Sequence, residues 1–248
     1  MTVSRDVGLL AELVRSAGSV VALTGAGISV PSGIPDFRSP GTGLWEHVDP
    51  MEVAHIDAWR RDPRRFWQFY GRRFALLSGK RPNAAHEALV ELETRGMLDA
   101  VITQNIDMLH RRAGTRRLVE VHGSIATSSC RACGAGYAYD EVVERLGLDG
   151  LPLCDCGRAL KPDVVLFGEY LPLPALERAS DLAIDADLLL CVGSSLEVHP
   201  VARLPELTLH RGGEVAIVTR GRTPFDDRAA VKLEGDVEDE LRALIAAL

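Results

Sequence analysis

Short apolar runs alternate with helical patterns along most of this chain. Val20 to Thr24 is an apolar run that stops at a glycine, which predicts a buried parallel strand. Strands separated by helical segments are typical of a doubly wound parallel sheet, so we predict a fold of the α/β class. The other predicted strands are residues 100–103, 118–121, 164–167, 188–192 and 215–218.

Capping residues indicate where the helices begin and end. Ser4 is a candidate N-cap for a helix that reaches about Ala17. Asp62 followed by Pro63 predicts a second start, and Asn83 is a candidate cap for a helix ending near Gly96. A last helix is expected over about 237–248.

Two stretches interrupt this alternation. Residues 36–80 are mainly loop and helix with concentrated aromatic side chains, and residues 124–160 are rich in cysteine, glycine and short turns. We predict that both belong to a smaller inserted module. The larger sheet domain is then formed by residues 1–35, 81–123 and 161–248.

Composition and charge narrow the class of protein. The 248 residues are 46% apolar and 25% charged, which is ordinary for a globular α/β protein. A net charge of −7 supplies no basic field for phosphates, so we expect no nucleic-acid partner. With no long apolar run and no export signal, we expect no membrane partner and a cytoplasmic location. The oligomeric state is open, with a monomer as the expectation.

Small-residue turns follow two of the predicted strands. Gly25, Ala26 and Gly27 would let the backbone approach a pyrophosphate at a helix start. Position 30 is valine, so the three-glycine fingerprint of dehydrogenases is not met. A tight turn without a ligand remains an alternative for either segment. The second turn contains Gly193, Ser194 and Ser195.

A polar segment and a histidine follow two other predicted strands. Gln104, Asn105 and Asp107 could bind a ribose diol and a carboxamide, although Asn105 could instead cap a helix over 106–112. His122 has a side chain that can accept a proton from a sugar hydroxyl near neutral pH. Because ligands bind at the carboxyl ends of parallel strands, these residues are candidates for one site.

Four cysteines form two close pairs, Cys130 with Cys133 and Cys154 with Cys156. In a chain without an export signal, this spacing predicts a tetrahedral structural zinc site. The second pair has one intervening residue instead of two, which tightens its loop. The fifth cysteine, Cys191, lies within an apolar run and is expected in the core.

Taken together, these segments resemble the sirtuin family from about Ser16 to the C-terminus. The resemblance implies a large Rossmann-like NAD-binding domain with a small zinc-binding and helical domain. It implies an NAD-dependent protein-lysine deacylase that consumes NAD and releases nicotinamide, free lysine and 2′-O-acyl-ADP-ribose. The acyl-lysine oxygen first displaces nicotinamide, and His122 then deprotonates the ribose diol.

The resemblance also assigns roles by position. Asn105 and Asp107 would act with His122, and loop 29–45 would exclude water from the reacting sugar. The dinucleotide would contact the two glycine turns, together with Phe37, Arg38, Gln104, Asn105, Asp107 and Thr219. A substrate peptide would add as a β-strand. Its contacts would be Val165, Phe167, Gly168, Glu169, Leu196 and Glu197.

Tyr70 and Arg73 are three residues apart on one predicted helix, so they project from one face. This pair resembles the sirtuin subclass that removes succinyl and malonyl groups, because an arginine beside a tyrosine hydroxyl suits a substrate carboxylate. A solvated arginine is the alternative for Arg73. Two other functions stay open for the chain: protein ADP-ribosyl transfer and a non-catalytic NAD sensor.

Overall fold

Six short strands form one parallel sheet in the order β3-β2-β1-β7-β8-β9. The computed structural model describes residues 4–36 and 48–248. The first strand, β1, lies near the centre of the sheet. The chain adds β2 and β3 on one side of β1 and then β7, β8 and β9 on the other, which is the doubly wound arrangement. The strands are β1 (Val20–Thr24), β2 (Ala100–Thr103), β3 (Leu118–Glu120), β7 (Leu188–Val192), β8 (Glu214–Val218) and β9 (Val231–Leu233).

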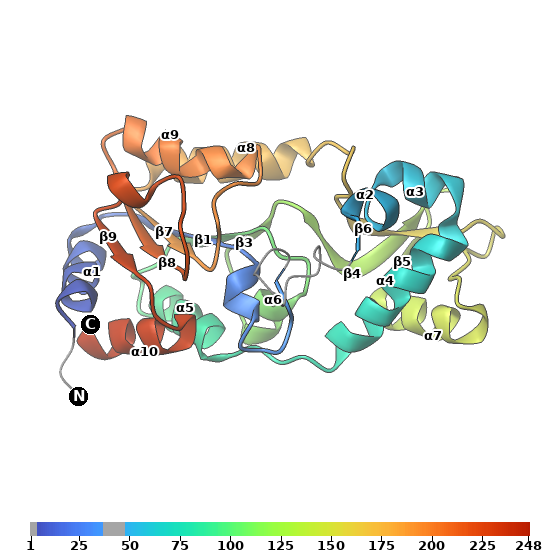
Figure 1. Ribbon diagram of the computed structural model, residues 1–248, viewed down its shortest axis with the longest axis horizontal. Coiled ribbons are helices and arrows are strands. Elements are labelled where there is room, and N and C mark those ends of the chain that lie inside the picture. Colours follow the sequence, from blue (N-terminus) through green and yellow to red (C-terminus); the bar gives the residue numbers. More distant parts are fainter. Residues whose placement is uncertain (1–3, 37–47) are drawn as a thin grey trace.

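Helices cover both faces of this sheet (Figure 1). One face packs against α1 (Arg5–Ser16), α5 (Ala84–Thr94) and α10 (Val237–Ala247), and their leucines share an apolar cluster with the sheet. The other face packs against α8 (Leu173–Asp185) and α9 (Leu204–His210). Both faces are covered, which explains why β1 and β7 are buried throughout and almost entirely apolar.

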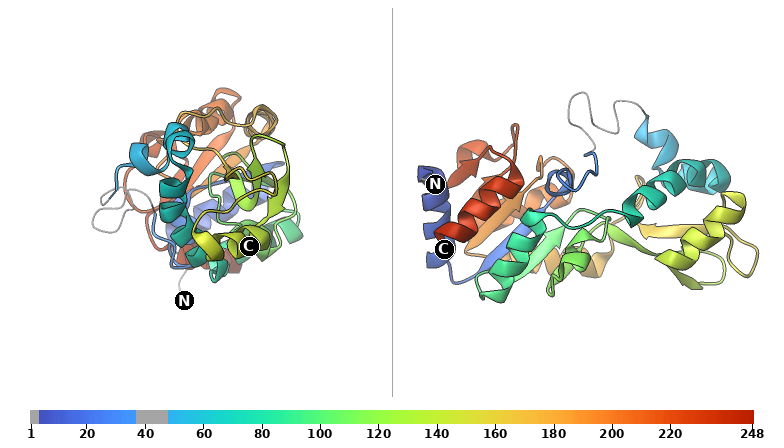
Figure 2. Two further views of the ribbon diagram at one scale, coloured as in Figure 1. Left: turned by 90° about the vertical axis from the view of Figure 1, so that its right-hand side faces the viewer. Right: turned by 90° about the horizontal axis from the view of Figure 1, so that it is seen from below.

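A smaller module lies at the other end of the long axis of the molecule (Figures 1 and 2). Its antiparallel sheet has the order β5-β4-β6, and its aromatic core is separate from that of the larger domain. Trp67 donates from its indole nitrogen to the carbonyl of Leu160 at 2.8 Å, which attaches the helices to the sheet. The elements are α2 (Pro50–Val53), α3 (Ile56–Arg61), α4 (Pro63–Ser78), β4 (Gly123–Cys130), β5 (Gly136–Ala138), α7 (Tyr139–Asp149) and β6 (Leu160–Val164).

Short elements connect the sheet to the site. The 3-10 helix η1 (Ala26–Ser29) follows β1, and α6 (Leu109–Ala113) follows β2. Beyond β7 lie the 3-10 helices η3 (Val201–Arg203) and η4 (Asp226–Arg228). Because the strands are parallel, the turns that follow them lie together at one edge of the sheet, where the strands end.

Most strands and helices predicted from the sequence are present, with three differences. The strand expected at 164–167 is β6 at 160–164, because its ladder pairs with β4 and ends at Val164. Residues 161–164 therefore lie in the smaller sheet, whereas we expected the larger domain to resume at 161. Asn105 does not cap a helix over 106–112, since α6 begins at Leu109 and Asp107 accepts its first N–H.

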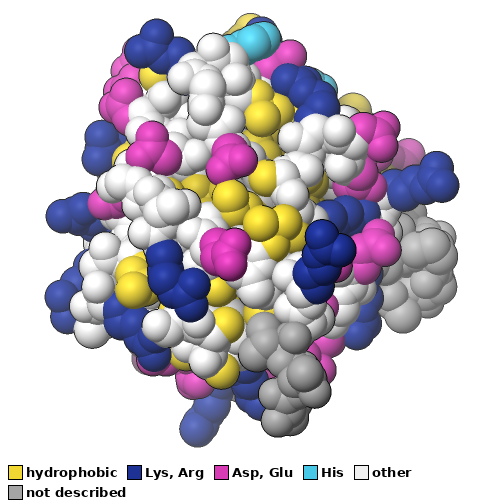
Figure 3. All heavy atoms as spheres, turned by 90° about the vertical axis from the view of Figure 1, so that its left-hand side faces the viewer, with side chains coloured by type: hydrophobic (Ala, Val, Ile, Leu, Met, Phe, Trp, Pro, Cys, Tyr) yellow, Lys and Arg dark blue, Asp and Glu magenta, His cyan; other side chains and the backbone are white. Residues whose placement is uncertain are grey.

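Charges of both signs are mixed over the surface that carries α1 and α10 (Figure 3). Lysine and arginine side chains alternate there with aspartate and glutamate, so this face has no continuous basic patch. Among the described residues, no helix has both the length and the apolar character needed to cross a bilayer.

Candidate active site

Two glycine turns meet at the point where the sheet reverses direction. Gly25 donates its N–H to Val192 at 3.1 Å, and Gly27 donates to the Gly193 carbonyl at 2.7 Å. Gly193 has a φ of +61°, and a side chain there would come within 2.2 Å of the Ile28 nitrogen. Only glycine permits this approach, so the two turns pack directly against each other at the switch point.

Polar side chains from β1 and β2 form one network beside these turns. Asn105 donates its side-chain N–H to the Gly25 carbonyl at 3.0 Å and to Ser29 Oγ at 3.2 Å. Ser29 donates to Asp107 Oδ2 at 2.7 Å, and Gln104 donates to Ser194 Oγ at 3.0 Å. Asn105, Asp107 and Gln104 thus lie together with both glycine turns, as the sequence predicted for a single site.

Ser29 is a site residue that the sequence analysis did not assign. It belongs to the first glycine motif and is buried, and its hydroxyl joins Asn105 to Asp107. Burial raises the pKa of Asp107, while hydrogen bonds from Leu109 and Ser29 and the charge of Arg112 oppose that shift. The carboxylate is therefore fixed in direction by two donors within the protein.

His122 follows β3 and lies half-buried at the same edge of the sheet. Its Nδ1 lies 3.0 Å from the Gln104 carbonyl oxygen. A carbonyl can only accept, so Nδ1 carries the proton and Nε2 keeps its lone pair. Burial lowers the pKa of His122, although the bond to Gln104 acts in the opposite direction. The imidazole is neutral at pH 7 and can accept a proton at Nε2.

A second, deeper layer supports the strand ends. Thr24 Oγ1 donates to Thr103 Oγ1 at 2.8 Å and lies 2.9 Å from His110 Nε2. Thr103 Oγ1 in turn accepts the Asn105 N–H at 3.1 Å. The ring of His86 lies 4.8 Å from that of His110, centroid to centroid. Burial lowers the pKa of His86 to about 4, and burial together with His86 lowers the pKa of His110 to about 3.

These two histidines predict an acid-dependent loss of stability. Between pH 6.5 and about 4, the unfolded chain binds protons that folded His86 and His110 do not, so the free energy of unfolding falls as pH falls. The loss is on the order of 1 kcal/mol per pH unit for each histidine. Urea unfolding at pH 7.5, 6 and 5 measures it.

The variant His110→Gln should flatten this pH dependence, because it removes one titrating group from the buried pair. His210 is exposed at the end of α9, so His210→Gln serves as the control and should leave the dependence unchanged. An identical slope for wild type and His110→Gln would show that the buried pair does not titrate as described.

The four paired cysteines converge at the end of the smaller sheet. Their sulfur atoms all lie within 4.8 Å of one another, with Cys130 to Cys156 at 3.6 Å and Cys133 to Cys154 at 3.4 Å. A tetrahedral zinc with Zn–S bonds of about 2.3 Å requires sulfurs about 3.8 Å apart, so this arrangement fits the ion. With four protein ligands such zinc has no open position, and its role is structural.

Tyr70 lies on α4, in the smaller module. It is buried, its ring stacks on Phe66 at 4.4 Å, and it belongs to an apolar cluster against which Ile106 and Met108 also pack. Those two residues flank Asp107, so the cluster that contains Tyr70 extends to the segment that carries Asp107. Arg73 lies one turn further along α4, and its side chain is outside the described part of the structure.

The predicted peptide-binding residues occupy two segments. Val165 donates its N–H to His122 at 2.8 Å, so the first segment begins beside the candidate base. On the other side, Leu196 donates its N–H to Ser194 Oγ at 3.2 Å, beside the second glycine turn. Glu169 to Leu171 and His199 to Pro200 line a common pocket of about 450 Å³ with Leu173 and Leu176.

The five remaining predicted cofactor contacts are Phe37, Arg38, Thr219, Ala26 and Ser195. Phe37 and Arg38 lie outside the described residues. Thr219 is buried at the end of β8, where its N–H donates to Leu233. Ala26 and Ser195 are half-buried in the two turns.

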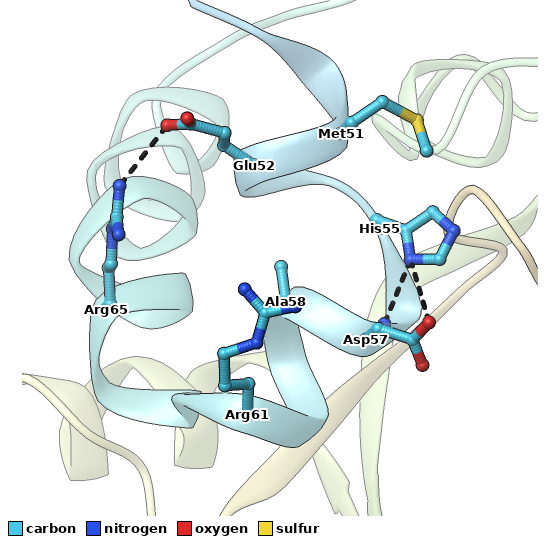
Figure 4. A pocket seen from close by; sticks show the side chains of 7 residues that line it. All are labelled: Met51, Glu52, His55, Asp57, Ala58, Arg61 and Arg65. Atoms are coloured by element: carbon cyan, nitrogen blue, oxygen red, sulfur yellow. Dashed lines mark hydrogen bonds and ion pairs between the residues drawn. The ribbon is translucent and has the colours of Figure 1, made fainter.

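Another pocket, of about 320 Å³, lies among α2, α3 and α4 (Figure 4). Arg65 pairs with Glu52 across it at 3.3 Å, and His55 lies 3.6 Å from Asp57. None of the strand-end residues lines it, so we do not include it in the candidate active site.

Comparison with known proteins decides the family. The model of the Sir2 family matches residues 25–200, which contain both glycine turns, His122 and the four cysteines. The chain belongs to the Sir2 family. This confirms the sirtuin resemblance. The Sir2-family chain is 41% identical to an NAD-dependent protein deacetylase of Thermotoga maritima, over 94% of this chain and 95% of that protein.

Two further curated relatives have comparable similarity. An NAD-dependent protein deacetylase of Sulfolobus acidocaldarius is 42% identical, over 96% of this chain and 93% of that protein. An NAD-dependent protein deacylase 2 of Pyrobaculum aerophilum is also 42% identical, over 95% and 93%. Each alignment spans nearly the full length of both proteins.

Solved Sir2 structures share the fold. A Sir2 variant with a deacetylated p53 peptide and 3′-O-acetyl ADP-ribose superposes with a TM-score of 0.91 at 40% identity, covering 96% of both chains. A Sir2 complex with p53 peptide and NAD⁺ gives 0.88 at 40% identity, again over 96% of each chain. Sir2 with a propionylated peptide gives 0.87 at 40% identity and 96% coverage. The Rossmann-like fold with a small zinc-binding module, expected for this Sir2-family chain, is confirmed.

Proposed function

We propose that this Sir2-family chain is an NAD-dependent protein-lysine deacylase. The observation that carries the proposal is the meeting of His122, Asn105, Asp107 and both glycine turns at one edge of the sheet. Relatives named NAD-dependent protein deacetylases, and Sir2 structures with NAD⁺ and peptide, support it. NAD is the co-substrate, and the four cysteines hold one structural zinc ion.

The geometry supports a specific division of roles. The turns at Gly25 and Gly193 lie against the pyrophosphate, while Asn105 and Asp107 hold the ribose and the carboxamide. Neutral His122 takes a proton from the ribose diol at Nε2, with Nδ1 held by Gln104. Nicotinamide leaves as the acyl oxygen bonds the ribose carbon, and the deprotonated 2′-oxygen then attacks the acyl carbon. One water molecule is consumed as the lysine amine is released, which leaves 2′-O-acyl-ADP-ribose. Phe37 shields the reacting sugar carbon from water.

The substrate peptide binds by strand addition between 165–168 and 196–197. Among the described residues, the Val165 carbonyl and the Gly168 N–H have no hydrogen-bond partner. They provide an acceptor and a donor for an extended peptide. The Val165 N–H donates to the backbone carbonyl of His122, so this edge begins next to the residue that carries the base.

We further propose a preference for acidic acyl groups. Tyr70 is buried in the apolar cluster that extends to the segment of Asp107, and Arg73 follows it by three residues on α4. An arginine and a tyrosine hydroxyl on one helix face can hold the free carboxylate of a succinyl or malonyl group by charge-assisted bonds. Acetyl-lysine lacks this carboxylate and is expected as a weaker substrate of the same site.

Substitution of Arg73 tests the acyl preference. The variant Arg73→Met should lower kcat/KM for succinyl-lysine peptide by about 10²-fold and leave acetyl-lysine peptide within about threefold, because only the former loses a charge pair. Mass spectrometry of matched peptides with NAD gives both rates. The exposed neighbour Arg72 provides the control Arg72→Met. Equal loss on both peptides would remove the acidic-acyl assignment without affecting the deacylase proposal.

A further inference from the structure

Lys161 is a buried lysine on β6, and its ammonium group is fully engaged within the protein. It is 5% exposed, and Nζ donates to the carbonyls of Val164 at 2.8 Å and Pro162 at 3.1 Å. Nζ also pairs with Glu169 Oε2 at 2.8 Å. An unpaired charge at this position would be costly, so Lys161 depends on Glu169. Val164 is the last residue before the candidate peptide-binding edge.

Glu169 lies at the other end of the peptide-binding edge, directly after Gly168. Its Oε2 accepts the Leu166 N–H at 3.1 Å, and its own N–H donates to the Leu166 carbonyl at 3.0 Å. Gly168 has a φ of +81° at the third position of this turn, where a left-handed residue is required. The sequence analysis placed Glu169 among the peptide contacts, but its carboxylate is directed at groups of the protein itself. The turn and the ion pair together hold residues 164–169 in one conformation.

Arg131 connects this turn to the cysteine cluster. It lies between Cys130 and Cys133 and donates to Glu169 Oε1 at 3.2 Å, while its side chain is 56% exposed. One carboxylate oxygen of Glu169 thus binds Lys161 on β6. The other binds Arg131, which lies in the loop of the first cysteine pair. A shift of that cysteine pair would displace the carboxylate that holds the peptide-binding edge.

We propose that Arg131, Glu169 and Lys161 are positioning residues that couple the zinc module to affinity for the acyl-peptide. This inference rests on the proposed deacylase function. The Val165 carbonyl and the Gly168 N–H bind a peptide strand well only when their spacing is fixed beforehand. Among residues 4–36 and 48–248, no hydrogen bond or ion pair joins these three side chains to the cofactor motifs. Their loss therefore weakens peptide binding and leaves NAD binding and the chemical step unchanged.

The test compares peptide affinity with NAD affinity in single variants. Arg131→Gln should raise the peptide KM about threefold, because it removes one partly exposed ion pair, which contributes little free energy. Glu169→Gln should raise it by about tenfold or more, since it also leaves Lys161 without its counter-charge. In both, kcat, the NAD KM and one zinc per chain should be retained. Fluorescence anisotropy of a labelled acetyl-lysine peptide measures affinity independently of turnover.

Arg145 supplies the matched control. It belongs to the same module and contacts the second cysteine pair, through Asp155 at 2.9 Å and the Leu153 carbonyl at 2.8 Å, but not the peptide-binding edge. Arg145→Gln should leave the peptide KM unchanged. The double variant Arg131→Gln with Glu169→Gln should bind peptide no more weakly than Glu169→Gln alone, because Arg131 acts only through that carboxylate.

The outcomes separate this inference from the proposed function. Wild-type protein that deacylates, together with Arg131→Gln and Glu169→Gln variants of unchanged peptide affinity, overturns the coupling alone. A rise in peptide KM accompanied by zinc loss or an equal rise in NAD KM also overturns it, because the effect is then general. Wild-type protein that deacylates no peptide overturns the function instead.

Discussion

Replacement of His122 by alanine is expected to reduce the rate of deacylation by about 10²- to 10⁴-fold, the usual contribution of a general base. The Nδ1–H of His122 is committed to the Gln104 carbonyl, so Nε2 is the atom that accepts the proton. NAD binding should persist, because the two glycine turns and Asn105 do not depend on the imidazole. Steady-state rates on an acetyl-lysine peptide, with NAD affinity measured in parallel, test this.

The order of the proposed steps predicts a second property of the His122→Ala variant, which concerns nicotinamide release. In the proposed mechanism His122 acts after nicotinamide has left, so His122→Ala should still release up to about one equivalent of nicotinamide per chain in a single turnover. His210→Ala, at the exposed end of α9, is the control and should behave as wild type. Retention of normal deacylation by His122→Ala would show that another group is the base.

Replacement of one cysteine of the cluster is expected to abolish zinc binding and lower the melting temperature by roughly 10 °C. Cys154→Ser suits the test, because Cys154 is buried and its sulfur accepts from Tyr137 at 3.3 Å. The first cysteine pair begins at the last residue of β4, and the second pair precedes β6. Without the ion, the link between these two strands at the end of the small sheet is lost. Elemental analysis and thermal unfolding give the two readouts.

The fifth cysteine distinguishes zinc loss from ordinary core damage. Cys191 is fully buried in β7, within the larger domain. Cys191→Ala should keep one zinc per chain even if the cavity lowers stability. Equal zinc content in wild type and Cys154→Ser would contradict the assignment of the cluster as the metal site.

The carboxyl-end turns of the strands were predictable because each signal is local. Glycines after β1 and β7, polar residues after β2 and His122 after β3 stand directly beside apolar runs in the sequence. Parallel strands bring such ends to one edge, so the sheet class alone places these residues together. The zinc site was predictable for the same reason, because the short spacing within each cysteine pair is itself typical of zinc ligands.

Other features depend on contacts between distant segments and have no local signal. Asn105 has the residue type of a helix cap, yet it bonds Gly25 and Ser29, which are 80 and 76 positions away. His86 and His110 meet through the packing of α5 on α6. The family resemblance assigned Glu169 to peptide contact, and only the fold shows its carboxylate paired with Lys161 and Arg131.

The measurement that tests the central claim most directly is a full account of products. Wild-type protein, NAD and one peptide carrying acetyl- or succinyl-lysine are incubated together, and every product is quantified by mass spectrometry. The account predicts equal amounts of free lysine peptide, nicotinamide and acyl-ADP-ribose, with no reaction when NAD is omitted. ADP-ribosylated peptide, or loss of the acyl group without NAD, would contradict it.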